Sequence, residues 1–323
     1  MSDKLTQKDK TWIAWAPLLA AFVTILLLFF VQDYSRGYGF VSRPIFQHVI
    51  HGYKADGGEW SFGFAIPFAV LVLVYLNRKE LGELPKEPDV LKGGALLLFS
   101  LLVYFMGFRA NEKYLGYVSG QLLIASLIIW FGGLRFFFKL FWVWCLLGML
   151  WPWLILIGRI STPLQIIMVE LTSGFLRLTG VDLVTQGTAI LTDTADPKTG
   201  EPISLNVAAA CSGIRSFFAM IMISLVMGLL QLRSDSKRFA LLVMVPIVTI
   251  AGNFVRMLML YYGSKVAGTA FAIGEGEGNE SGYHIISGLV VFVVAIAILL
   301  FIVTLLNGGL KVLKRKKVVS RSV

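Results

Sequence analysis

Long apolar segments constrain the fold of this chain more than any other feature. A membrane-spanning helix needs about 20 apolar residues, because each residue adds about 1.5 Å across a hydrocarbon layer of about 30 Å. The candidate segments are 12–31, 61–76, 91–108, 115–131, 138–158, 206–230, 239–261 and 285–306. The sequence therefore predicts an all-α polytopic membrane protein with about eight transmembrane helices.

The composition agrees with this fold class. Hydrophobic residues make up 57% of the chain and charged residues only 15%, with a mean hydropathy of +0.77. A soluble domain is nearer a quarter charged. The net charge of +10 does not indicate nucleic-acid binding, because Lys and Arg gather in short loops and at the termini. We expect a single integral membrane domain over 1–323, with lipid around it and no nucleic-acid partner.

Clusters of basic residues predict the orientation, since Lys and Arg in short loops stay on the cytoplasmic side. All the main clusters fall on one side if eight helices alternate across the membrane. These clusters are Lys4/Lys8/Lys10, Arg78/Lys79, Arg233/Lys237/Arg238 and Lys311–Lys317. We therefore expect both termini to be cytoplasmic, in a bacterial inner (cytoplasmic) membrane. The loops 32–60, 159–205 and 262–283 then face the periplasm or cell exterior.

The second of these outer loops contains two predicted elements. Pro163–Gly180 is apolar but interrupted by Glu170 and Arg177, a pattern that predicts an amphipathic helix at the membrane interface. Two short strands follow within 187–205, and Asp196-Pro-Lys-Thr-Gly200 supplies the turn between them. We expect a small extracytoplasmic β-hairpin, whose edge offers a pairing site to an extended substrate segment.

Three ionisable side chains lie at the outer ends of predicted helices. Cys211 and Arg256 are each about five residues from such an end, and His284 begins the last apolar segment, so all lie within about 8 Å of the outer interface. Ionisable groups are costly inside a membrane and usually mark function. Their shared depth predicts a small water-accessible active site.

The chemistry of these groups is complementary. A cation such as Arg256 lowers the pKa of a nearby thiol, or stabilises the oxyanion of a tetrahedral intermediate. His284 suits a general base that later protonates a leaving amine. Gly213 leaves room for a substrate backbone, and Arg215 lies one helical turn below Cys211 on the same face. Together they predict acyl transfer at a peptide or thioester carbonyl.

Each residue also has a simpler interpretation. Cys211, like Cys145, can be a small apolar filler, Arg256 can extend to the interface, and His284 can be an interfacial residue without a task. The small residues 208–213 can serve tight helix packing. His48 and His51 have a metal-binding spacing but no evident third ligand, so we expect a solvated pair, no metal and no cofactor.

The motif residues resemble the exosortase/archaeosortase family of membrane cysteine transpeptidases. The resemblance rests on Ala-Cys-Ser-Gly-Ile-Arg at 210–215, then Asn253-x-x-Arg256, then His284, and covers about 200–300. Earlier, Trp-Ser-Phe-Gly-Phe-Ala-Ile-Pro at 60–67 is similar to the family's Ser-His-Gly-Phe-x-x-Pro stretch. Phe62 stands where many members have histidine.

The resemblance implies a catalytic triad and a substrate class. Cys211, Arg256 and His284 would be catalytic. The residues implied to position the substrate are Ser212, Gly213, Arg215 and Asn253. Family substrates are exported proteins whose C-terminal signal holds a short motif such as Pro-Glu-Pro, a transmembrane helix and a basic tail. The enzyme would form a thioacyl intermediate and pass it to water or to an acceptor linked to exopolysaccharide or lipid.

Two alternative functions remain open. The chain can be a non-enzymatic transporter or scaffold of envelope polysaccharide export, in which case Cys211 is replaceable. It can also be a membrane acyltransferase that carries a fatty acyl group on Cys211. Many exosortases carry an appended soluble C-terminal domain. This chain ends soon after its last apolar segment, so we expect no such domain here.

Overall fold

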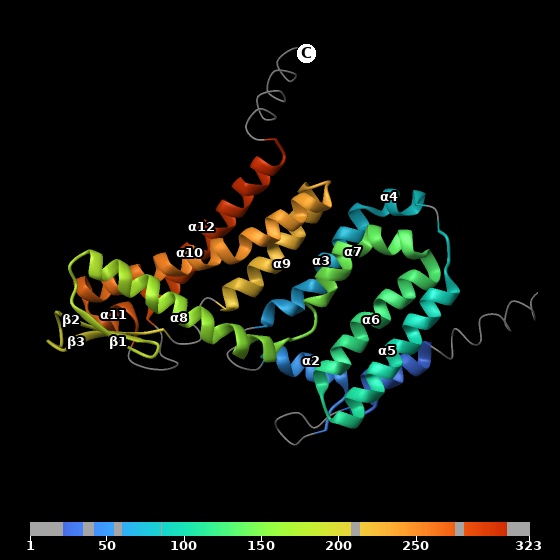
Figure 1. Cartoon of the computed structure of the whole chain (residues 1–323), viewed down its shortest axis with the longest axis horizontal. Coiled ribbons are helices and arrows are strands. Elements are labelled where there is room, and N and C mark those ends of the chain that lie inside the picture. Colours follow the sequence, from blue (N-terminus) through green and yellow to red (C-terminus); the bar gives the residue numbers. More distant parts are fainter. Residues whose placement is uncertain are drawn as a thin grey trace, which may run out of the picture. The chain divides into compact units, whose positions relative to one another are not determined.

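The structure is a computed structural model that describes residues 22–34, 42–54, 60–84, 86–207, 214–274 and 281–308 (Figure 1). Two compact units divide the chain between Pro152 and Trp153. The first holds most of the aromatic packing and the stretch 60–67, and the second holds Arg215, Asn253, Arg256 and His284. That the whole chain forms a single domain stays a prediction.

The first unit is helical throughout its described part. Its elements are η1 (Leu27–Val31), α2 (Ile45–Lys54), η4 (Ser61–Ala65), α3 (Ile66–Leu76), α4 (Arg78–Glu83), α5 (Val90–Ala110), α6 (Lys113–Gly132) and α7 (Leu134–Gly148). The two long helices α5 and α6 form an antiparallel pair, in which Ser100 and Ser119 donate hydrogen bonds to each other's carbonyl oxygens at 3.2 and 2.9 Å. Gly93 permits this approach, because a Cβ there would lie 2.6 Å from the Trp130 Cα.

A polar network joins α6 to the end of the first unit. The Gln121 side chain donates to the Trp144 carbonyl at 2.6 Å and accepts from the Trp151 indole at 2.9 Å. The Trp144 indole donates to the Gln121 carbonyl at 2.9 Å. Because unsatisfied polar groups are costly in apolar surroundings, these bonds fix α7 and Trp151 against α6.

The predicted span 138–158 is wrong, because the helix is broken in its middle. α7 ends at Gly148 and α8 (Leu154–Leu178) begins after Pro152. Proline lacks an amide hydrogen and disfavours helical geometry in the preceding residue, which explains the break. Pro163–Gly180 is helical as predicted but does not form a separate helix, since most of this segment continues α8, which contains Pro163. That it lies at the membrane interface stays a prediction.

The second unit combines a small sheet with long helices. After α8 come β1 (Leu183–Gln186), β2 (Ala189–Ala195), β3 (Pro202–Asn206), α9 (Ile214–Gln231), α10 (Asp235–Ala267), α11 (Thr269–Ala272) and α12 (Gly282–Leu306). Helices α9, α10 and α12 lie side by side (Figure 1), and buried apolar residues form a core between them. This core includes Met220, Leu232, Leu241, Val245, Ala295, Leu299 and Val303.

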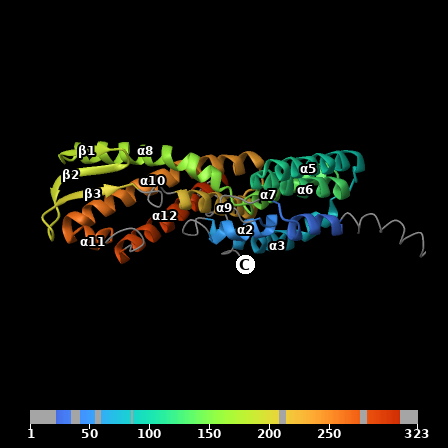
Figure 2. The same cartoon turned by 90° about the horizontal axis from the view of Figure 1, so that it is seen from below.

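The sheet is antiparallel in the order β1-β2-β3. The predicted hairpin is present as β2 and β3, joined by the predicted turn at Asp196–Gly200, whereas β1 is a third strand that the sequence pattern missed. Ile190 and Leu205 of the sheet are buried with Leu176 of α8 and Tyr261 of α10. Figure 2 shows the strands lying beside α8 and α10.

One carboxylate fastens the hairpin turn to the helices. Asp196 is buried and accepts hydrogen bonds from the amides of Lys198 and Thr199 at 2.8 and 3.3 Å, and from the Thr269 amide at 2.5 Å. These bonds hold the pKa of the Asp196 carboxyl well below its usual range, because they stabilise the charged form. The hairpin therefore has a fixed position on α10 and α11.

The predicted membrane fold is confirmed. Among the described residues, α5, α6, α8, α10 and α12 are long and apolar enough to cross a membrane. Phe22–Val31, Ser61–Leu76 and Ser216–Gln231 are shorter apolar helices. The expected solvated pair of histidines is wrong, because α2 buries His48 while His51 is exposed.

Candidate active site

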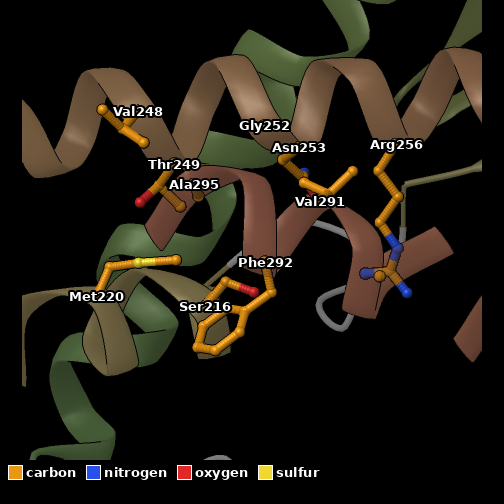
Figure 3. Close-up of a pocket in the computed structure, with 11 residues that line it drawn as sticks. Ser216, Met220, Val248, Thr249, Gly252, Asn253, Arg256, Val291, Phe292 and Ala295 are labelled. Carbon is orange, nitrogen blue, oxygen red and sulfur yellow. The ribbon is translucent and has the colours of Figure 1, made fainter. Parts of the chain in front are cut away.

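Arg256 extends from α10 onto the backbone of α12. A Cβ atom on Gly288 would lie 3.2 Å from both Cζ and Nη2 of Arg256 and 3.4 Å from its Nε. Figure 3 shows the Arg256 side chain running from α10 toward α12. Its guanidinium therefore packs between helices, which argues against an arginine that merely extends to the lipid interface.

His284 lies one helical turn from this contact. It is in the first turn of α12, only 3% exposed, and precedes Gly288 by four residues, so both share one helix face. The Ser281 hydroxyl accepts from the His284 amide at 3.0 Å and caps the helix. The Tyr283 hydroxyl donates to the Met259 carbonyl at 3.1 Å, which ties this turn to α10.

A small pocket adjoins Arg256 between α9, α10 and α12. It offers about 20 Å³ to the centres of water molecules, enough for about one water. Ser216 of α9, Thr249 and Asn253 of α10 and Phe292 of α12 line it (Figure 3). Thr249 Oγ1 and Arg256 Nε are buried and have no hydrogen-bond partner among the described residues. The pocket region thus contains polar groups that are available to hydrogen-bond a water molecule or a ligand.

Arg256 also lacks a counter-ion in the part of the chain that the structure describes. Ion pairs such as Lys92–Asp89, Arg135–Glu87 and Arg238–Asp235 are described there, and none of these involves Arg256. A cation among apolar helices is costly unless something compensates it. A guanidinium in this place can stabilise a negative charge, such as that of a thiolate or an oxyanion.

The structure places some of the predicted site residues and leaves others open. Asn253 and Arg256 line one pocket where α10 packs on α12, and His284 lies on α12 one turn before Gly288, the residue that Arg256 contacts. Cys211, Ser212 and Gly213 lie outside the described residues. Arg215 lies in the first turn of α9, the helix that packs on α10 and α12. The catalytic and positioning roles of these residues stay predictions.

Sequence reasoning missed Ser216, Thr249 and Gly288. A signal for Thr249 was present, since Thr249, Asn253 and Arg256 follow each other at helical spacing and form one polar stripe in an apolar helix. Gly288 could be found only as the residue one turn after His284. The helix α10 extends beyond the predicted span 239–261 at both ends, since it runs from Asp235 to Ala267, and its residues Met257, Leu260 and Tyr261 pack with the sheet.

A comparison with protein families decides the assignment. A model of the transmembrane exosortase family matches residues 55–301, which includes the whole Cys211-to-His284 region. The chain belongs to the transmembrane exosortase family. Comparisons of this exosortase with curated proteins and with solved structures found no match. Membership makes the protein a multi-pass membrane protein and supports, in general, a cysteine transpeptidase role.

Proposed function

We propose that this exosortase cleaves the C-terminal sorting signals of exported proteins, with Cys211 as nucleophile and Arg256 and His284 as its partners. The observation that carries the proposal is Arg256, which has no described counter-ion and contacts α12 at Gly288, one helical turn after the buried His284. The chain connects this site closely to Cys211, because α9 is described from Ile214, three residues later.

The first half of the reaction forms a thioester. His284 takes the proton of the Cys211 thiol, and the thiolate sulfur attacks the carbonyl carbon of the scissile peptide bond. Arg256 stabilises the negative charge on the oxygen of the tetrahedral intermediate. The intermediate collapses as the carbon–nitrogen bond breaks and His284 gives its proton to the leaving amine. The signal helix and basic tail depart with that amine.

The second half transfers the new C-terminus. An acceptor amine, or water, attacks the thioester carbonyl while His284 accepts its proton. The carbon–sulfur bond breaks, and the sulfur recovers a proton from His284. The acceptor amine would belong to a glycan or lipid of the envelope. No cofactor is needed for either half, because every step exchanges protons and acyl groups only.

The site is proposed to face the periplasm or cell exterior, with both termini cytoplasmic. If α8 replaces 138–158 as a span, eight alternating spans still place all the basic clusters on one side. The sequence 133–153 then joins that cytoplasmic side, and it contributes Arg135 and Lys139. The positive-inside rule therefore supports the same orientation with the corrected helices. The sheet and the first turn of α12 fall on the opposite side.

Trapping of the intermediate tests this proposal. The purified enzyme is incubated with an exported reporter whose C-terminal tail carries Pro-Glu-Pro, a transmembrane helix and a basic cluster. We expect a hydroxylamine-sensitive adduct of the reporter on Cys211, and none on Cys211→Ala. A fatty acyl adduct on Cys211 would indicate an acyltransferase instead. The absence of any adduct on an intact Cys211 would favour the non-enzymatic scaffold or transporter.

A further inference from the structure

The outer edge of β3 has main-chain groups that no residue in the described part of the chain pairs with. Val207 donates its amide hydrogen to the Thr188 carbonyl at 2.8 Å, and Leu205 is paired with Ile190 in the same register. Main-chain groups alternate in direction along a strand, so those of Leu205 face β2 and those of Ser204 and Asn206 face away. No described strand pairs with this outer side, because β3 is the last strand of the sheet.

The rest of the sheet holds this edge in place. Ile203 and Leu205 are buried in the core shared with α8 and α10, while Ser204 and Asn206 are exposed. At the other end of the strand, Asp196 fastens the turn to the Thr269 amide. A preorganised edge loses little conformational entropy when a further strand is added to it.

The chain links this edge directly to the proposed nucleophile. Asn206 ends β3, and Cys211 follows five residues later, a stretch of chain that reaches at most about 18 Å. β3 therefore runs toward Cys211 in sequence. A substrate segment paired with Asn206 would therefore lie within a few residues' reach of Cys211.

We propose that the outer edge of β3 binds, as an added parallel strand, the substrate segment that precedes the scissile bond. The inference rests on the proposed function. The parallel direction follows from the chain direction of the substrate. Its chain runs from the exported domain to the membrane helix, and β3 likewise runs toward Cys211 and α9. Main-chain hydrogen bonds to Ser204 and Asn206 hold this segment. Because the side chains of Ser204 and Asn206 are small, the edge discriminates little between different substrate residues.

Proline substitutions at matched edge positions test the proposal. Ser204→Pro removes one outward amide hydrogen without removing a bond to β2, and proline is tolerated on edge strands. Thr185→Pro is the control on β1. The pairing of Val184 with Leu191 and the bond from the Asp193 amide to the Asp182 carbonyl turn the Thr185 amide outward as well. Both residues are exposed and carry a hydroxyl.

The readout is steady-state cleavage of the reporter described above by the full-length enzyme. For Ser204→Pro we expect KM to rise by about 3- to 10-fold with little change in kcat, as for the loss of one hydrogen bond of about 1 kcal/mol. Thr185→Pro should stay within about 2-fold of the wild type. Equal losses in both variants, or no loss in Ser204→Pro, would overturn the proposal.

Site-specific photo-crosslinking provides a second test that does not depend on whether the proline variants fold. A benzoyl-phenylalanine is placed at Asn206 or, as control, at Thr185 in the Cys211→Ala enzyme. We expect adducts from Asn206 that map to reporter residues before the cleavage site, and few from Thr185. Crosslinks from Thr185 alone would refute the β3 site. If the wild type forms the reporter thioester yet no β3 crosslinks appear, this inference fails and the proposed function stands.

Discussion

The Arg256 guanidinium lies where α12 has no side chain, against the backbone of Gly288. A Cβ on Gly288 would lie 3.2 Å from the guanidinium carbon, closer than ordinary van der Waals contact. The glycine thus sets how closely the charge approaches α12 and His284, which lies one turn away on the same face.

Gly288→Ala should lower reporter cleavage by about 10-fold without unfolding the protein. The added methyl group displaces the guanidinium by a few tenths of an ångström, and catalysis is sensitive to such displacement. Gly282→Ala is the matched control on the same helix, because a Cβ there would meet no atom within 4 Å. Cleavage rates and melting temperatures are compared. Equal activity of the two variants would show that the Gly288 contact is unimportant.

Arg256→Lys should reduce kcat by about 100-fold, although it retains the charge. Lysine is a point charge without the planar fork that matches a carboxylate or oxyanion, and loss of one oxyanion donor costs about 100- to 1,000-fold. Arg177→Lys on α8, where the arginine is exposed, should remain near wild type. Wild-type turnover by Arg256→Lys would restrict Arg256 to a role in topology.

Asp196 should make the hairpin sensitive to acid. Because its pKa is lowered in the folded protein, its stabilisation is complete above the ordinary carboxyl pKa of about 4 and is lost as the pH falls through the lower folded value. Hydrogen-exchange protection of residues 190–205, corrected for intrinsic rates, should therefore decrease below about pH 4 in the wild type.

Asp196→Asn should lower that protection already at neutral pH and remove its acid dependence. The exposed Asp193 provides the control, since Asp193→Asn should behave like the wild type. An acid transition that persists unchanged in Asp196→Asn would assign it to another group.

The two cysteines should differ in reactivity. Cys145 is half-buried among the aromatic residues of α7, whereas Cys211 is proposed to lie near Arg256. A maleimide should label Cys211 faster than Cys145 at neutral pH, because a nearby cation favours the thiolate. Labelling of Cys211 should slow in Arg256→Ala but not in Arg177→Ala. Equal labelling of both cysteines, unaffected by Arg256, would support the packing interpretation.

The sequence predicted the membrane fold and the β2–β3 hairpin, since both follow from local patterns. Apolar length predicts spanning helices, and Asp196-Pro-Lys-Thr-Gly200 is a strong turn signal. The break between α7 and α8 was missed because apolar content alone continues through Pro152. β1 was missed because four residues carry too weak an alternation to identify a strand.

The sequence identified residues of the candidate site but not the contacts between them. Arg256 and His284 were identified because ionisable groups are rare in apolar segments. The contact of Arg256 with Gly288 depends on how α10 packs on α12, and no local pattern encodes that register. The pocket beside Ser216 likewise exists only because three helices meet there.

The most direct test compares the C-terminal peptides of exported proteins in cells that carry the wild type, Cys211→Ala or Cys145→Ala. We expect precursors with a short motif, a membrane helix and a basic tail to accumulate only in Cys211→Ala cells. The peptides that Cys211→Ala cells lose would then locate the cleavage site. Identical C-terminal profiles in the Cys211→Ala and wild-type cells would contradict the account and make a scaffold or transporter the better explanation.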